Sequence, residues 1–208
     1  MKKSIVFILL GFLFLCCSPK IRYFNENNVE ISKAKFEEIR STNALLDIPG
    51  DSTHHRKLTL REKRGKLTNK PKLEALLSKA TEREIDPNKP IAIIYYPGKD
   101  RCNSTGSATK EKIRKKNERF IENMNILAGI KPIHIYKDKK GLDKYEGSVD
   151  WVKDPEGIVE KLFFEYHYPC YSFVVISKNG YYISYFGEFG STYVLRVTET
   201  ILNFDKSN

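Results

Sequence analysis

The chain has 208 residues, of which 40% are hydrophobic and 30% are charged, and its formal net charge is +10 at pH 7. This length predicts one domain of ordinary size with a smaller appendage, and the apolar content suffices for a packed core. The positive residues are spread along the chain, with denser runs at residues 61–66, 110–116 and 137–140. Such a distribution favours nonspecific attraction to anionic surfaces and argues against a specific nucleic-acid site.

Residues 1–17 have the pattern of an export signal. Lys2 and Lys3 precede an unbroken apolar run over residues 5–15, which is short for a membrane span. Cys16 and Cys17 follow the run in place of an A-x-A-like cleavage site. This pattern resembles a bacterial lipoprotein signal, in which a cysteine after a small residue is lipidated and becomes the first residue of the mature chain. The resemblance implies lipidation of Cys17.

A lipid at this position implies a lipoprotein of the bacterial cell envelope, anchored to a membrane and facing the periplasm or the exterior. The alternatives are an ordinary secretory signal and an uncleaved anchor. Each alternative also places the remainder of the chain outside the cytoplasm.

Residues 18–68 are predicted to form a polar tether and a small α+β extension. Adjacent histidines in it, His54 and His55, have no carboxylate or cysteine partner at ligand spacing, so we expect no metal there. The expected elements are strands at 22–24 and 29–31, a helix over 33–40 capped by Ser32, and strands at 44–48 and 57–61.

Residues 69–208 are predicted to form the main domain, in which helices alternate with strands. The Lys178-Asn179-Gly180 sequence is a strong hairpin signal between two strands rich in apolar and aromatic residues. The expected elements are a helix from 69 to about 85, strands at 91–96 and 133–136, a helix over 107–127, a helix beginning at 154–156, strands at 173–176 and 181–186, and a helix over 192–204.

Cys102 lies between a buried-looking strand and a predicted helix. Unpaired amides at a helix N-terminus, together with the basic run that follows, stabilise a thiolate, which is the reactive form of cysteine. If Cys16 and Cys17 belong to the signal and the lipid, Cys102 and Cys170 are the two that remain. An even pair in an oxidising compartment indicates a disulfide or a redox couple.

The order of elements from residue 69 resembles the thioredoxin fold, and the resemblance covers about two-thirds of the chain. It rests on Cys102 at a strand-to-helix turn, on the strand at 173–176 with its hairpin, Gly187 and closing helix, and on Pro169 at the place of the family's cis-proline. The implied fold is α/β, a three-layer α/β/α sandwich with a mixed central sheet over residues 69–208, plus the small α+β extension.

The redox motif departs from the family pattern. The family's C-x-x-C reads C-N-S-T at residues 102–105, so the resolving thiol is missing from its usual place. In the family the cis-proline loop lies against the redox cysteine. The resemblance therefore implies that Cys170, directly after Pro169, lies next to Cys102.

Three uses of this pair remain open. A structural disulfide would close a loop of about 69 residues and stabilise the fold by roughly 4 kcal/mol. A redox couple would use Cys102 to attack and Cys170 to resolve, with His167 as a nearby base. A lone Cys102 thiol would serve isomerase-like or binding chemistry.

The leading functional hypothesis is a thioredoxin-like envelope lipoprotein that acts as a thiol–disulfide oxidoreductase, with Cys102, Pro169 and Cys170 as its site. The alternative is a non-enzymatic lipoprotein whose disulfide only stabilises the fold and whose basic, tyrosine-rich surface binds a partner. The expected partners are the membrane, through the lipid, and a protein partner or a disulfide substrate. No cofactor is expected, because residues 98–106 lack the Gly-Lys-Ser/Thr sequence of a phosphate-binding loop.

Overall fold

The structure is a computed structural model that describes residues 20–104 and 108–207. The predicted signal and the predicted lipidation site at Cys17 lie outside the described residues. Within the described ranges, no helix combines the length and apolar character needed to cross a bilayer.

A six-stranded mixed sheet forms the centre of the fold, with the strand order β5-β10-β9-β6-β7-β8. β6, β7 and β8 are parallel, whereas β9 is antiparallel to both β6 and β10, and β10 is antiparallel to β5. Every residue of β6 and β9 is buried, as expected for central strands that helices cover on both faces. The strands are β5 (Glu62–Lys66), β6 (Ile91–Tyr96), β7 (Ile133–Tyr136), β8 (Trp151–Lys153), β9 (Ser172–Ile176) and β10 (Tyr181–Tyr185).

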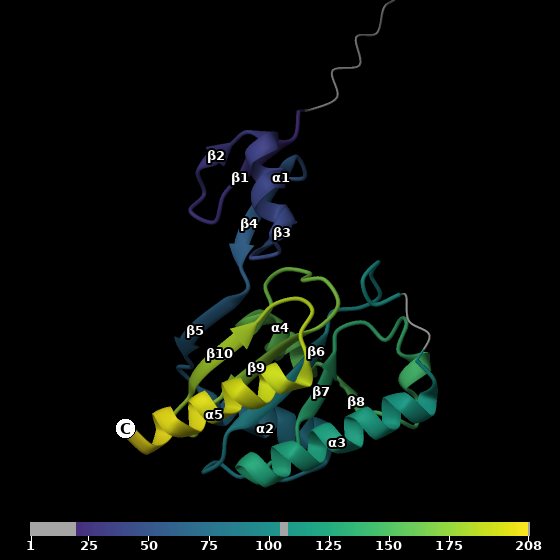
Figure 1. The fold of residues 1–208 in the computed structure, drawn as a ribbon. Coiled ribbons are helices and arrows are strands. Elements are labelled where there is room, and N and C mark those ends of the chain that lie inside the picture. Colours follow the sequence, from purple (N-terminus) through teal and green to yellow (C-terminus); the bar gives the residue numbers. More distant parts are fainter. Residues whose placement is uncertain (1–19, 105–107, 208) are drawn as a thin grey trace, which may run out of the picture.

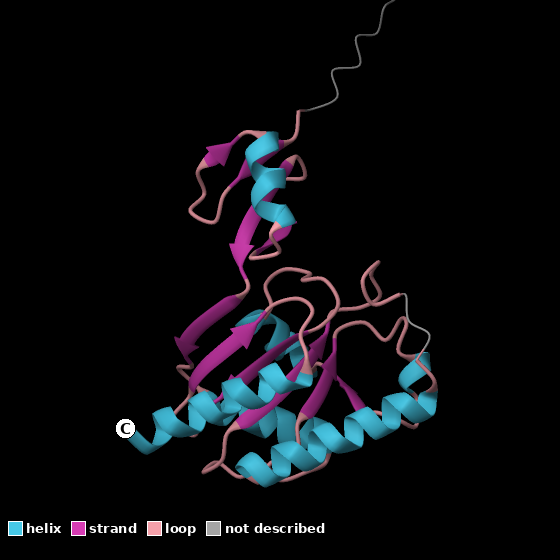
Figure 2. Ribbon diagram, viewed as in Figure 1, coloured by secondary structure: helices cyan, strands magenta, loops and turns pink. Residues whose placement is uncertain are grey.

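Helices cover both faces of this sheet (Figures 1 and 2). α3 (Lys110–Ala128) and α5 (Ser191–Ser207) pack on one face through one apolar cluster. α2 (Lys70–Thr81) and α4 (Ile158–Phe163) pack on the other face through a second cluster. The period-2 alternation of β6 divides its side chains between the two clusters. The predicted α/β class is therefore confirmed.

The N-terminal extension contains a separate four-stranded sheet, ordered β2-β1-β4-β3, and one helix (Figure 1). The predicted cap is confirmed, because Ser32 Oγ accepts a hydrogen bond of 3.2 Å from the backbone N–H of Lys35. Its elements are β1 (Arg22–Phe24), β2 (Glu30–Ile31), α1 (Lys33–Ser41), β3 (Leu45–Pro49) and β4 (His55–Leu60).

The strands β5 and β8 were not expected from the sequence. β5 pairs with β10, so the main sheet begins at Glu62, before the boundary predicted at residue 68. The sequence of β5, E-K-R-G-K, has no apolar alternation because the strand lies at the edge of the sheet and most of its side chains face solvent. β8 is also an edge strand, of three residues, which is too short for a periodic pattern.

The helix after Cys102 begins later than predicted. Thr109 Oγ1 caps α3 by accepting a hydrogen bond from the N–H of Lys112, and the helix begins at Lys110, eight residues after Cys102. The prediction that the amides of this helix stabilise a Cys102 thiolate therefore loses its basis. Residue 107, the first of the predicted range, lies outside the described residues.

His134 in β7 gives the folded state a specific dependence on pH. It is buried, and burial lowers its pKa from 6.5 to about 4; Asp150 opposes this shift, whereas Lys131 and Arg83 add to it. Below pH 6.5 the unfolded chain therefore binds a proton that the folded chain does not. The stabilisation is complete above about pH 6.5 and is lost as the pH falls toward 4.

We expect the wild-type free energy of unfolding to fall by about 2 kcal/mol more than that of His134→Gln between pH 7 and pH 5. Urea unfolding at both pH values measures this difference, and groups other than His134 cancel between the two proteins. Parallel pH profiles would show that His134 is not the group responsible.

Candidate functional site

Cys102 and Cys170 form a disulfide bond, with their Cα atoms 5.1 Å apart and 68 positions apart in sequence. Cys102 lies in the loop that leaves β6, and Cys170 lies in the loop that enters β9. Because β6 and β9 are antiparallel neighbours, with Tyr95 paired to Ser172, the end of one strand lies beside the start of the other. The pairing that the resemblance implied is confirmed.

The two cysteines differ in exposure and in backbone conformation. Cys102 is exposed, whereas Cys170 is only 5% exposed. The φ angle of Cys170 is +67°, in the left-handed region that residues other than glycine seldom occupy. Reagents in solvent therefore reach the bond from the Cys102 side.

Asp100 holds Cys170 in this conformation. Its Oδ2 atom accepts a hydrogen bond of 2.8 Å from the backbone N–H of Cys170, and its Oδ1 atom accepts one of 2.8 Å from the N–H of Asn103. Its side chain is only 16% exposed, so these charge-assisted bonds are partly shielded from water. Asp100 thus joins the two cysteine loops through its side chain.

The side chain of Asn103 also connects the two cysteine loops, in this case as a donor to backbone carbonyls. Its Oδ1 atom accepts a hydrogen bond of 2.9 Å from the N–H of Asp100. Its buried Nδ2 group donates to the carbonyl of Gly98 at 2.8 Å and to the carbonyl of Cys170 at 3.2 Å. The two loops are therefore connected by hydrogen bonds that do not involve the sulfur atoms.

The prediction of a cis bond at Pro169 is wrong. No cis peptide bond occurs in the described residues, so the peptide bond before Pro169 is trans. The unusual geometry lies one residue later, in the left-handed backbone of Cys170, which is supported by its hydrogen bonds to Asp100 and from Asn103. Pro169 nevertheless lines a pocket beside Cys102, so it remains a residue of the site.

His167, predicted as a nearby base, contacts Asp100. Its Nε2 atom lies 3.3 Å from Asp100 Oδ2, and its side chain is 47% exposed. An exposed imidazole at this distance contributes little to the stability of the fold. When the ring is protonated, its positive charge attracts the Asp100 carboxylate. In the structure His167 contacts Asp100, and Asp100 in turn accepts a hydrogen bond from the Cys170 backbone.

Glu188 is the ionisable side chain that approaches the sulfur atoms. A carboxylate oxygen of Glu188 and the two cysteine sulfurs all lie within 4.8 Å of one another. If the disulfide is reduced, these three groups are ligands of the types that bind zinc. In the disulfide state the sulfurs are bonded to each other, and no thiolate is present to act as a ligand.

The N-terminal extension forms one wall of the pocket beside the disulfide. The pocket has a volume of about 270 Å³, and both Cys102 and Glu188 line it. The extension contributes Arg40 and Leu46, and Arg61 enters from the connection to the main sheet. A substrate that reaches Cys102 through this pocket would meet two arginines and two carboxylates, those of Asp47 and Glu188.

Removal of the Glu188 carboxylate should make the reduced protein more reactive. A negative charge near Cys102 opposes formation of the thiolate, which is the species that alkylating reagents attack. We expect iodoacetamide to alkylate reduced Glu188→Gln about two- to tenfold faster than reduced wild type at pH 7. Glu165→Gln, a change at an exposed glutamate that does not line this pocket, is the matched control and should react at the wild-type rate. Equal rates for Glu188→Gln and wild type would contradict this role.

Three residues of this site were missed in the sequence: Asp100, Asn103 and Glu188. The D-x-C-N order around Cys102 places two turn-forming side chains three residues apart, and such residues commonly bind nearby backbone amides. The roles of Asp100 and Asn103 could therefore be predicted from the sequence. The approach of Glu188 depends on a distant loop that follows β10, and local sequence contains no sign of it.

Comparison of the chain with protein-family models, with curated protein sequences and with solved structures gives no match.

Proposed function

We propose that this protein is a thioredoxin-like lipoprotein of the bacterial cell envelope, anchored through Cys17, that exchanges its Cys102–Cys170 disulfide with thiol substrates. The strand order β7-β6-β9-β10 supports the thioredoxin-like assignment. It combines a parallel β-α-β unit with an antiparallel hairpin that leads into a closing helix, and the cysteine loop follows the central strand β6. The envelope assignment rests on the pattern of residues 1–17.

One observation carries the redox part of the proposal. An exposed Cys102 is bonded to a buried Cys170, and hydrogen bonds through Asp100 and Asn103 join the same two loops. An exchange site needs one accessible sulfur, and it also needs an arrangement that persists while the bond is open. The exposure of Cys102 supports the first condition, and hydrogen bonds that do not involve the sulfur atoms support the second.

The exchange proceeds in two steps. A substrate thiolate attacks Cys102 Sγ, the disulfide breaks, and Cys170 leaves as a thiolate that takes up a proton. A second substrate thiolate then attacks the substrate sulfur of the mixed disulfide, and Cys102 leaves as a thiolate that is protonated in turn. The substrate gains a disulfide, and the protein receives two electrons and two protons as its pair becomes a dithiol. The reverse sequence reduces a substrate disulfide.

Reaction of the oxidised full chain with a reduced dithiol peptide tests the proposal. We expect one peptide disulfide to form for each protein disulfide consumed, faster than with oxidised glutathione at equal concentration. The control is the Cys102→Ser/Cys170→Ser variant, which should leave the peptide reduced. A rate no higher than that of oxidised glutathione would reject the proposal.

A structural disulfide in a non-enzymatic lipoprotein is the second candidate. The sequence separation of 68 favours it, because closure of so long a loop stabilises a fold by about 4 kcal/mol. The tyrosine-rich surface of this alternative is only partly available. Tyr168 and Tyr182 are buried, and Tyr171 stacks against Trp151. A partner surface would therefore depend on the exposed basic residues.

A further inference from the structure

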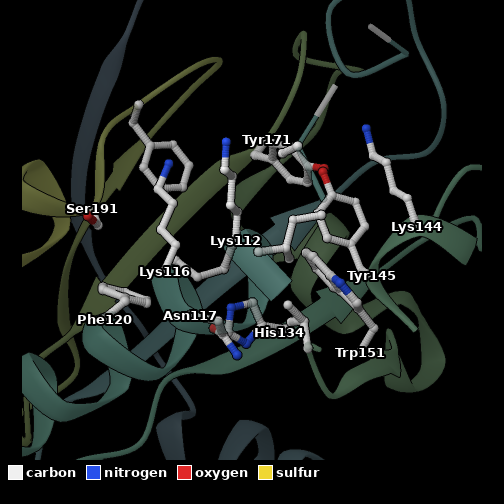
Figure 3. Close-up of a pocket in the computed structure, with 15 residues that line it drawn as sticks. Lys112, Lys116, Asn117, Phe120, His134, Lys144, Tyr145, Trp151, Tyr171 and Ser191 are labelled. Atoms are coloured by element: carbon white, nitrogen blue, oxygen red, sulfur yellow. The ribbon is translucent and has the colours of Figure 1, made fainter. Parts of the chain in front are cut away.

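A second cavity lies on the α3 and α5 face of the main sheet, with a volume of about 390 Å³. It is bounded by α3, by side chains of β6, β7 and β8, and by the segments that precede β9 and α5 (Figure 3). Its volume lies in the range of pockets that hold small organic molecules. None of the site residues described above lines it.

Aromatic side chains form much of the wall. Trp151 stacks on Tyr171, with ring centroids 6.1 Å apart, and Tyr145 meets Trp151 edge-on at 6.2 Å. The hydroxyl groups of Tyr145 and Tyr171 are hydrogen-bonded to each other. His134 lies against Trp151, and because burial lowers its pKa to about 4, its ring is neutral at pH 7. The interior is therefore mainly aromatic and carries no charge at pH 7.

Lysines surround this interior. Lys112 and Lys116 are one helical turn apart on α3, and Figure 3 shows their side chains extending to the same side of the pocket as that of Lys144. Among the described residues that line the pocket, none is acidic. Within residues 108–207, Lys112 and Lys116 also have no carboxylate partner, whereas the neighbouring Lys115 pairs with Glu111 at 2.9 Å.

Two further groups favour a polar head on the ligand. The indole nitrogen of Trp151 is buried and has no hydrogen-bond partner among the described residues, although such groups are normally satisfied. Lys144 is already oriented, since its Nζ atom donates to the Asn103 carbonyl at 2.7 Å and lies 5.1 Å from the Tyr145 ring centroid. Its position is therefore fixed before a ligand arrives.

We propose that this pocket binds an amphipathic carboxylic acid, with the alkyl body among the aromatic rings and the carboxylate beside Lys112 and Lys116. The aromatic walls match an apolar body, and two lysines in a lining that contains no acidic residue match a single anionic head. The proposal does not depend on redox chemistry at Cys102, because neither cysteine lines this pocket.

Trp151 is the only tryptophan of the chain, so its fluorescence reports on the pocket directly. The oxidised full chain is titrated with micromolar dodecanoate and, separately, with dodecanol, which lacks the charge. We expect a saturable change with dodecanoate and an affinity about tenfold lower for dodecanol. No saturable change with dodecanoate, or equal affinities for the two compounds, would overturn the proposal.

Charge variants on α3 separate a specific site from general attraction. Lys112→Gln/Lys116→Gln should weaken dodecanoate binding about tenfold and leave dodecanol binding unchanged. The matched control, Lys115→Gln/Arg119→Gln, removes the same charge from residues of the same helix that do not line the pocket, and should bind dodecanoate as the wild type does. Equal weakening by both pairs would show that only the net charge matters and would overturn the proposal.

Discussion

Cys102→Ser is expected to abolish thiol–disulfide exchange, whereas Cys170→Ser should still react with an oxidised peptide to form a mixed disulfide. Cys102 is exposed, so its thiol in Cys170→Ser remains open to attack on a substrate disulfide. Among the described residues, the thiol that remains in Cys102→Ser is that of Cys170, which is 5% exposed. We expect it to react with a disulfide reagent roughly tenfold or more slowly.

The measurement is a non-reducing gel of each variant after incubation with an oxidised peptide. A shifted band should persist in Cys170→Ser, because this variant lacks the Cys170 thiol that would attack Cys102 and release the peptide. Each variant lacks the disulfide and therefore loses the same stabilisation from loop closure, about 4 kcal/mol. A difference in trapping between the two variants is then not due to a difference in stability. Equal trapping by both variants would contradict the assignment of Cys102 as the reacting cysteine.

Asp100→Ala is expected to lower the free energy of unfolding of the oxidised protein by about 3 kcal/mol. The substitution leaves the backbone N–H groups of Asn103 and Cys170 without their acceptor, and it removes the contact to His167. An unpaired buried N–H costs about 1–3 kcal/mol, and solvent that enters the vacated space recovers part of this cost. Denaturant unfolding of the oxidised protein measures the change.

Asp100→Asn gives a graded comparison, because its amide retains one of the two carboxylate oxygens as an acceptor. It should lose about half as much stability as Asp100→Ala. Asp150→Ala is the control for removal of a surface carboxylate, since the side chain of Asp150 is 88% exposed, and it should cost less than about 0.5 kcal/mol. A cost for Asp100→Ala no larger than that for Asp150→Ala would show that Asp100 does not hold the loops together.

Asp100→Ala should also slow closure of the disulfide after reduction. The hydrogen bonds of Asp100 and Asn103 to the Cys170 backbone do not involve the sulfur atoms, so we expect them to keep the two cysteine loops close to each other after reduction. Their loss lowers the effective concentration of one thiol at the other. The reduced protein is reoxidised with oxidised glutathione in the absence of air, and mass spectrometry measures the rate of disulfide closure.

The central elements could be predicted from the sequence because their signals are local. β6 and β9 are continuous apolar runs, and the Asn179-Gly180 turn between β9 and β10 is a two-residue hairpin signal. α5 shows its apolar residues at helical spacing. Each of these patterns is short enough to be read without knowledge of tertiary contacts.

The misses have a common physical cause, which is dependence on distant partners. β5 is a strand only because β10 offers it an unpaired edge, and its own residues are charged. The backbone of Cys170 is held by a hydrogen bond that its N–H donates to Asp100 and by one that its carbonyl accepts from Asn103, 70 and 67 positions away. The approach of the extension is likewise non-local, since a Cβ atom on Gly187 would lie 3.2 Å from a side-chain carbon of Leu46. Local sequence could not specify these contacts.

The reduction potential of the Cys102–Cys170 pair tests the proposed exchange function most directly. The full chain is equilibrated in glutathione or dithiothreitol buffers of known potential, and the fraction of free thiols is measured after rapid alkylation. Exchange predicts a potential between about −120 and −270 mV, the range of disulfide oxidants, isomerases and thioredoxins. A potential below about −300 mV is that of a structural disulfide and would contradict the exchange function.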